Sequence, residues 1–322
     1  MPEKRKVVID CDTGVDDALA LLLAFQHLDV VGITTVGGNV GLSNVQRNTR
    51  YVAELAGRWD IPVFAGYDRP LLVPLQDASH VHGKGGLGPV VIPEPKKPLE
   101  PVHAVDFLID TFLHRDDVSL VTTAPLTNIA HALLREPRLK ERIPEILCMC
   151  GSTTYGNATP AAEFNIYVDP EAAKLVFESG IPMKMVGLNL CRQYVTTAQA
   201  TERLRALDTP VSRLAAALFD SRVDKSGMNH LCDVCCLMWY CAPEVITKSA
   251  PMHVAIETKG EFTRGMTLCD TRAFDTNIPA TDIGHQRSYS SFKGLPPNVE
   301  VALELDAQRF DQVFYETIRQ YR

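Results

Sequence analysis

The fold of this chain is decided near its start, where residues 7–18 read Val7-Val8-Ile9-Asp10-Cys11-Asp12-Thr13-Gly14-Val15-Asp16-Asp17-Ala18. Three β-branched apolar residues predict a short strand. A polar turn follows, and residues 16–27 then carry apolar side chains at helical spacing. A strand that leads through a polar turn into an amphipathic helix is the building unit of α/β proteins.

The same alternation continues along the chain. Its pattern predicts strands at 7–9, 30–35, 61–65, 118–121, 146–149 and 183–186, and helices at 16–27, 43–57, 126–134 and 169–179, with Ser43 as the N-cap of the second helix. Such an order indicates an α/β fold: a mostly parallel central sheet, Rossmann-like and open, with helices on both faces. Ligands bind beyond the carboxyl ends of the strands in such sheets, so we expect the active site there.

The length of 322 residues favours a single α/β domain, residues 1–322, with insertions. The first insertion is a loop at about 66–101, which holds seven of the 21 prolines. The second is a helical region at about 196–240, expected to cover the site. A strand at 252–257 and a helix at 310–321 complete the expected elements.

Composition and charge exclude several classes of protein. With 32 basic and 39 acidic residues the net charge is −7, which argues against a nucleic-acid partner, because phosphate binding needs a basic face. The longest apolar run, residues 18–25, is far shorter than the ~20 residues that span a bilayer, so no membrane partner is expected. No signal peptide is visible, and the odd count of nine cysteines predicts reduced thiols in a cytoplasmic protein.

Four carboxylates fall within eight residues: Asp10, Asp12, Asp16 and Asp17. A helix dipole stabilises acidic residues at a helix start by ~0.3–1 kcal/mol each, which explains the last two and leaves the first two unexplained. Converging carboxylates raise one another's pKa unless a cation intervenes. An all-oxygen donor set favours Ca²⁺ or Mg²⁺ over Zn²⁺. The turn is therefore predicted to bind a hard divalent cation.

The sequence of this turn resembles motifs of two enzyme families. Asp10-x-Asp12-Thr13 resembles the nucleophile motif of Mg²⁺-dependent haloacid-dehalogenase-like phosphohydrolases, but that motif leaves Asp16 and Asp17 without a task. The longer string, residues 10–18, resembles the N-terminal signature of the inosine–uridine-type nucleoside hydrolase family. Residues 123–130 and 157–170 resemble its second and third motifs, and His82 lies where that family has a site histidine. A non-catalytic metal-binding relative is the third interpretation.

The resemblance to nucleoside hydrolases implies an enzyme of nucleoside salvage that hydrolyses the N-glycosidic bond of ribonucleosides, purine or pyrimidine, to ribose and free base. It implies a Ca²⁺-bound water activated by an aspartate, and a homodimer or homotetramer. The implied Ca²⁺ ligands are Asp12, Asp17, the backbone oxygen of Thr123, and Asp233, with Asp12 also taking the proton of the water. Asp10 is expected to hold these carboxylates in position without contacting the Ca²⁺ ion itself.

The substrate side is implied by the same resemblance. The ribose is expected to contact Asp16, Asn157, Glu163 and Asn165, while Asn39 and Met149 line the pocket. Ordinary structural roles compete with this interpretation. Glu163 and Asn165 precede Asp169-Pro170, a typical helix start, and Met149 lies on an apolar strand where core residues are usual.

The chain departs from the family pattern at the late metal position, where Cys232 replaces the histidine that protonates the leaving base. A thiol with the usual pKa of about 8.5 is protonated at neutral pH but is a weak hydrogen-bond donor. His82 and His230 are alternative proton donors. Ala124 replaces a glycine, so its backbone must avoid positive φ. The loop at 66–101 and the stretch 219–229 are expected to contact the base, whose identity the sequence leaves open.

Overall fold

The computed structural model describes residues 4–221, 230–271 and 295–322. Its centre is an eight-stranded sheet in the order β3-β2-β1-β4-β5-β6-β10-β7, and β8 and β9 form a separate two-stranded sheet. The strands are β1 (Lys6–Cys11), β2 (Asp29–Thr35), β3 (Val63–Ala65), β4 (Val118–Thr122), β5 (Ile146–Met149), β6 (Met183–Val186), β7 (Ile246–Met252), β8 (Val254–Ile256), β9 (Thr267–Cys269) and β10 (Val299–Leu305).

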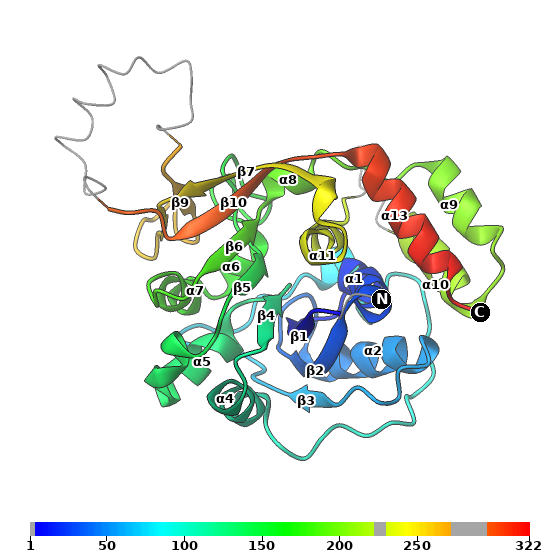
Figure 1. Cartoon of the computed structure of the whole chain (residues 1–322), viewed down its shortest axis with the longest axis horizontal. Helices are drawn as coiled ribbons and strands as arrows, with labels where there is room; N and C mark the ends of the chain where they lie inside the picture. The colour runs from blue at the N-terminus through cyan, green and yellow to red at the C-terminus, as the bar shows by residue number, and fades with distance from the viewer. Residues whose placement is uncertain (1–3, 222–229, 272–294) are drawn as a thin grey trace.

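Every neighbouring pair in the large sheet is parallel except β10–β7. The first six strands follow the order 3-2-1-4-5-6 of doubly wound sheets, in which the chain reverses direction across the sheet between β1 and β4 (Figure 1). The predicted mostly parallel sheet is confirmed. Its topology places a ligand site beyond the carboxyl ends of β1 and β4.

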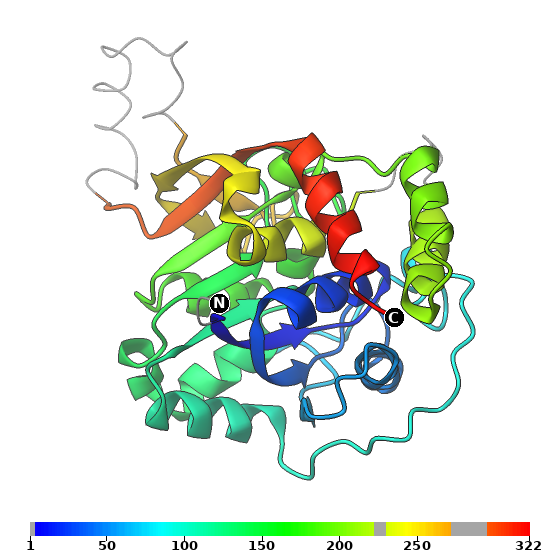
Figure 2. The same cartoon turned by 45° about the vertical axis from the view of Figure 1, so that its right-hand side comes forward.

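Helices cover both faces of the sheet (Figures 1 and 2). One face carries α1 (Val15–His27), α2 (Leu42–Leu55), α9 (Ala198–Arg205), α10 (Pro210–Ser221), α11 (Cys232–Cys241) and α13 (Ala307–Arg319), and the other carries α4 (Ala104–His114), α5 (Thr127–Arg135) and α7 (Pro170–Phe177). Shorter elements are α3 (Ser79–His82), α6 (Phe164–Val168), α8 (Leu188–Cys191), and the 3₁₀ turns η1 (Pro137–Glu141) and η2 (Pro243–Val245).

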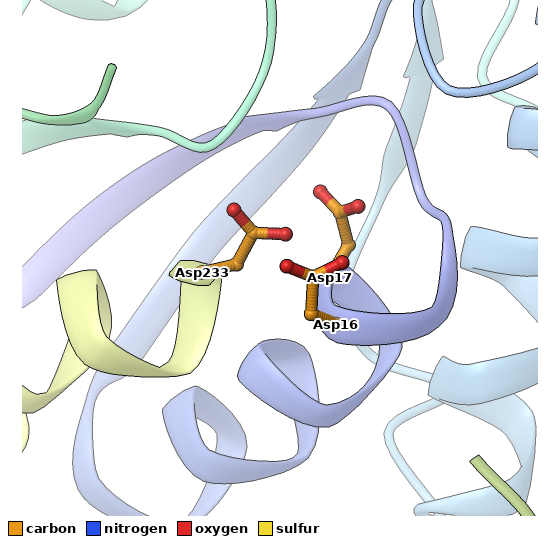
Figure 3. A group of neighbouring side chains, drawn as sticks. All are labelled: Asp16, Asp17 and Asp233. Atoms are coloured by element: carbon orange, nitrogen blue, oxygen red, sulfur yellow. The ribbon is translucent and has the colours of Figure 1, made fainter. Parts of the chain in front are cut away.

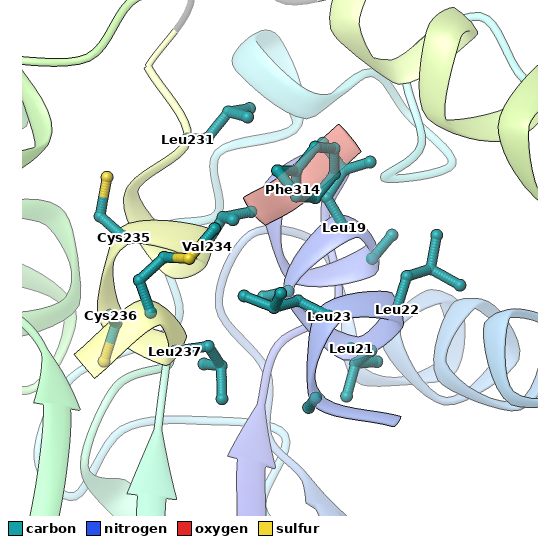
Figure 4. Packing of buried hydrophobic residues seen from close by; sticks show 14 of the residues in the cluster. Leu19, Leu21, Leu22, Leu23, Leu231, Val234, Cys235, Cys236, Leu237 and Phe314 are labelled. Atoms are coloured by element: carbon teal, nitrogen blue, oxygen red, sulfur yellow. The ribbon is translucent and has the colours of Figure 1, made fainter. Parts of the chain in front are cut away.

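Helix α1 lies inside the protein rather than on its surface. Its leucines pack against α11 and α13, in one apolar cluster that includes Leu19, Leu23, Val234 and Phe314 (Figure 4). A helix that is apolar on nearly all sides requires such enclosure, which accounts for the uninterrupted apolar run at residues 18–25. Packing α1 against α11 also brings the N-termini of these two helices together. Within the described ranges, no helix is both long and apolar enough to cross a membrane.

Several expected elements differ from the structure in their bounds. Helix α2 begins at Leu42 with Gly41 as N-cap, so the prediction of Ser43 as N-cap is wrong. The expected strand at 252–257 is the end of β7 followed by β8. The predicted start of α7 is confirmed, since the Asp169 side chain accepts the Ala172 N–H and Pro170 follows it.

The two insertions predicted from the sequence contain regular structure. The stretch 66–101 includes α3 and a bridge between Phe64 and Glu100, and α4 follows it as a helix the sequence pattern did not predict. The region 196–240 is helical over α9, α10 and α11. Its residues 222–229, which include most of the stretch expected to contact the base, lie outside the described residues.

Asn128 of α5 joins the ends of three segments beneath the predicted site. Its Nδ2 donates to Asp10 Oδ1 at 2.8 Å and to the Thr35 carbonyl at 3.1 Å, and its Oδ1 accepts the Tyr67 N–H at 3.0 Å. The side chain is fully buried. Because water cannot replace the lost partners there, each of these groups depends on Asn128.

We therefore predict that Asn128→Ala lowers the free energy of unfolding by about 2–4 kcal/mol, because Asp10, the Thr35 carbonyl and the Tyr67 N–H each lose a hydrogen-bond partner. Urea denaturation followed by circular dichroism measures the change. Leu134→Ala, at an exposed position of the same helix, serves as the control and is expected to stay within about 0.5 kcal/mol of the wild type. Equal stability of the two variants would contradict the role given to Asn128.

Candidate active site

A cavity of about 800 Å³ opens at the carboxyl ends of the central strands. The structure brings most of the sequence-predicted residues to its wall: Asp16, Asn39, His82, Thr123, Met149, Asn157, Glu163, Asn165, His230, Cys232 and Asp233. Asp10, Asp12 and Asp17 are buried behind this wall. Residues that are far apart in the sequence thus share one site, as expected at the point where strand order reverses.

Three carboxylates converge where α1 and α11 begin. Asp16, Asp17 and Asp233 each offer an oxygen, and these atoms lie within 4.8 Å of one another (Figure 3). All three side chains are buried. Elsewhere among the described residues, no group of three acidic, histidine or cysteine side chains converges in this way.

Asp12 lies beside this group and is joined to it by Asn39. The Asn39 amide nitrogen Nδ2 donates to Asp12 Oδ1 at 3.0 Å and to Asp17 Oδ2 at 2.9 Å, and the Asn39 N–H donates to Asp12 Oδ2 at 2.7 Å. Thr123 Oγ1 donates to Asp17 Oδ1 at 2.8 Å. A Cβ at residue 38 would lie 2.0 Å from Asp12 Oδ2, so only glycine permits this approach.

Burying these carboxylates close together is electrostatically unfavourable. Burial, followed by the charge of Asp16, raises the pKa of Asp17 to about 6. Burial and neighbouring aspartates raise the pKa of Asp12 and Asp233 well above the usual range. A cation would offset this repulsion, and the donors are all oxygens. The residues present therefore fit a hard divalent metal ion.

Asp10 is fully buried and, unlike Asp16, does not line the cavity. Its Oδ1 accepts Thr34 Oγ1 at 2.6 Å and Asn128 Nδ2 at 2.8 Å, whereas its Oδ2 is buried without a hydrogen-bond partner. Burial raises its pKa to about 7. Its hydrogen bonds tie β1 to β2 and α5, so Asp10 fixes the strand end from which the turn departs.

Glu163 and Asn165 lie on the opposite wall, at the start of α6. Glu163 caps this helix: Oε1 accepts the Asn165 N–H at 2.8 Å, and Oε2 accepts the N–H groups of Ile166 at 3.2 Å and Gly151 at 2.9 Å. The Asn165 side chain donates to the carbonyls of Thr123 and Met149, both at 3.0 Å. Glu163 thus caps α6, a short helix that the sequence did not predict, and not the helix at Asp169-Pro170 that it was expected to precede. The same side chain also lines the cavity.

The remaining wall carries groups able to donate a proton. His82 Nδ1 accepts the Val15 N–H at 3.1 Å, so the neutral ring carries its proton on Nε2. A Cβ at residue 14 would lie 2.3 Å from this Nδ1, which explains the glycine between Thr13 and Val15. His230 Nδ1 lies 3.1 Å from the Tyr194 carbonyl oxygen. Cys232, in the first turn of α11, is 9% exposed and faces the cavity.

Sequence reasoning missed Arg192, which follows α8 at the cavity rim. Its guanidinium donates to the carbonyls of Tyr155 and Gly156, both at 2.9 Å, and lies 3.7 Å from the centre of the Tyr155 ring. The end of strand β6, at Val186, is the signal that would have pointed to this region. Ala124 was assessed correctly, since its φ is not positive.

Comparison with known proteins identifies related enzymes. The family model described as inosine-uridine preferring nucleoside hydrolase matches residues 7–312. An uncharacterised protein of Schizosaccharomyces pombe is 40% identical over 276 residues, 82% of this chain and 89% of that protein. The pyrimidine-specific ribonucleoside hydrolase RihA of Citrobacter koseri is 38% identical over 325 residues, 98% of each chain.

Solved structures agree with the sequence comparison. A purine-preferring ribonucleoside hydrolase from Gardnerella vaginalis superimposes with a TM-score of 0.86 at 29% identity over 98% of each chain. A plant nucleoside hydrolase, PpNRh1, gives a TM-score of 0.87 at 30% identity over 99% of each chain. The phosphohydrolase interpretation of the first aspartates receives no support from these relatives.

Because these carboxyl pKa values are raised, both the stability of the fold and its affinity for a metal ion are expected to depend on pH. A carboxyl whose pKa is raised in the folded state stabilises the fold below its unfolded pKa of about 4, and this contribution is lost as the pH rises through about 6–7. Without a divalent ion the charged cluster thus destabilises the protein near neutrality, and a bound ion reverses the effect.

We predict that the difference in Tm between Ca²⁺ and chelator is small at pH 5 and grows to about 5 °C or more at pH 7.5. Differential scanning fluorimetry over this pH range measures it. Asp233→Ala should abolish the difference, while Asp110→Ala, at an exposed position of α4, should retain it. A difference that is constant with pH would contradict the coupling.

Proposed function

This chain belongs to the inosine–uridine-preferring nucleoside hydrolase family and hydrolyses the N-glycosidic bond of ribonucleosides. From that premise we propose that its metal is Ca²⁺, held by Asp12, Asp17, Asp233 and the backbone oxygen of Thr123. The observation that carries this proposal is the convergence of buried carboxylates at the start of α1 and α11. When bound, the ion lowers the pKa of a coordinated water and orients it.

Asp12 is the base that removes a proton from the attacking water. Its carboxylate is held in place by both donors of Asn39, so its orientation does not depend on the substrate. Without a cation, burial and the charge of Asp17 raise the pKa of Asp12. A bound cation would lower this pKa again and so keep the carboxylate ionised and able to accept the proton. The water oxygen forms a bond to the anomeric carbon, and the bond from that carbon to the base nitrogen breaks.

The ribose is held by side chains that offer both acceptors and amide donors: Asp16, Asn157, Glu163 and Asn165, with Asn39 and Met149 completing the wall. Positive charge develops on the sugar as the glycosidic bond breaks. Carboxylates fixed beforehand at this wall stabilise that charge without reorganising. The backbone donors on Glu163 keep its carboxylate aimed at the cavity.

The departing base takes the electron pair of the broken bond and needs a proton. Cys232 and His82 both line the cavity, and we assign proton donation or hydrogen bonding to the base to them, with His230 as the neighbouring candidate. His82 is suited as a donor through Nε2, because Nδ1 already accepts the Val15 N–H.

We propose that pyrimidine ribonucleosides are the better substrates. The support is the 38% identity, over nearly the full length, with a relative named pyrimidine-specific, against 29% with a structure named purine-preferring. We further propose that residues 1–322 act as one catalytic domain in a cytoplasmic homodimer or homotetramer, which size-exclusion chromatography with light scattering can measure.

We predict that Asp12→Ala lowers kcat for base release at least about 100-fold, because both the base and a metal ligand are lost. Reducing-sugar release from uridine and inosine measures the rate, and circular dichroism checks the fold. Asp110→Ala is the matched surface control. A folded Asp12→Ala variant that keeps most of the rate would refute the mechanism.

For the leaving base, we predict a higher kcat/KM for uridine and cytidine than for inosine and adenosine.

Cys232→Ala should lower kcat about 10-fold or more for nucleosides whose base must be protonated as it leaves. A riboside with p-nitrophenol as leaving group departs as a stable anion, so its hydrolysis should be unchanged in this variant. An equal loss on both substrates would assign Cys232 a structural role instead.

A further inference from the structure

Thr267, in strand β9, makes two hydrogen bonds to one residue, Ser152, in the loop that follows β5. This loop lies behind the part of the cavity wall that carries Glu163 and Asn165, which we call the sugar wall. Its Oγ1 accepts the Ser152 N–H at 2.8 Å and donates to the Ser152 carbonyl oxygen at 2.8 Å. The Thr267 side chain is buried, and so is Ser152. A hydroxyl is the smallest side-chain group that can accept from and donate to one residue's backbone in this way.

The residue next to Ser152 connects this contact to Glu163. Gly151 adopts a φ of +64°, and its N–H donates to Glu163 Oε2 at 2.9 Å. A Cβ at residue 151 would lie 2.4 Å from Thr267 Cγ2, so the threonine packs directly on this turn. The orientation of the Gly151 N–H therefore depends on where Thr267 holds the turn.

The hairpin that carries Thr267 is itself anchored to the helices of the sugar wall. Gly265 packs against the backbone of Tyr167, where a Cβ would lie 2.9 Å from the Tyr167 Cα. Both terminal nitrogens of Arg264 donate to the Glu171 carboxylate of α7. These contacts hold the hairpin against α6 and α7, so the position of Thr267 is fixed. Its hydrogen bonds to Ser152 then hold the turn at residues 151–152 in place.

We infer that Thr267 is a positioning residue for the sugar subsite: its hydroxyl holds the Gly151–Ser152 turn so that the Gly151 N–H aims the Glu163 carboxylate at the ribose. The inference rests on the proposed role of Glu163. Thr267 does not line the cavity, so it acts through Glu163 and not by touching the substrate.

Thr267→Val, which keeps the shape of the side chain and removes its hydroxyl, tests this inference. We expect KM for a ribonucleoside to rise about 10-fold, because a small displacement of a binding group weakens the bound complex strongly. Thr267→Ser keeps the hydroxyl and should restore KM to within about 3-fold of the wild type. Loss of stability alone would lower the active fraction and hence the apparent kcat, but would leave KM unchanged.

A double-mutant cycle with Glu163→Gln locates the effect. If Thr267 acts through Glu163, the double variant should have a KM no more than about 2-fold above that of Glu163→Gln alone. Leu268→Ala, at an exposed neighbour on the same strand, controls for damage to the hairpin and should leave KM unchanged. If Thr267→Val does not fold, Thr267→Ala enters the same cycle under the same criteria.

An unchanged KM in Thr267→Val, or KM effects that multiply in the double variant, would overturn the inference. Failure of the proposed function has a different signature, because wild-type enzyme would then release no base from any ribonucleoside. An inactive wild type therefore refutes the premise, whereas an active wild type with normal Thr267→Val kinetics refutes only the role of Thr267.

Discussion

The packing of α1 against α11 is the interaction on which the rest of the site depends. Apolar contacts around Leu23 and Val234 hold two helices side by side, and their N-termini carry Asp16, Asp17 and Asp233. These charges repel one another in a buried setting. The hydrophobic core therefore maintains an arrangement that electrostatics opposes, and that a bound cation would make favourable near neutral pH.

Close approach of the backbone completes this arrangement. Gly14 and Gly38 allow His82, Asn39 and Asp12 to lie nearer to the chain than a side-chain carbon would permit. Two helix N-termini point toward the carboxylates and offset part of their charge. The wall that carries Glu163 and Asn165 is built differently, because these side chains are held by hydrogen bonds to backbone groups.

The sequence predicted which residues line the cavity better than it predicted the boundaries of the elements. Motifs that follow strand ends carry chemically distinctive residues, so Thr123, Asn157 and Glu163 were recognisable without coordinates. Helix α4 and strand β10 lack such markers and were not expected. Arg192 and Thr267 were missed because each acts on a loop that is distant in sequence: Thr267 lies 115 residues from Ser152.

The sequence by itself determined the class of fold, the acidic character of the first turn and the family of the enzyme. Each of these depends on residue type and local spacing, which a linear pattern records. The family resemblance had already grouped Asp233 with Asp12 and Asp17. Only the tertiary structure decided that Asp16 converges with Asp17 and Asp233, that Asp12 is joined to them through Asn39, and which wall each donor occupies. Those relations depend on how α11 and the loops pack across the sheet, and packing between distant segments leaves no periodic signal in the chain.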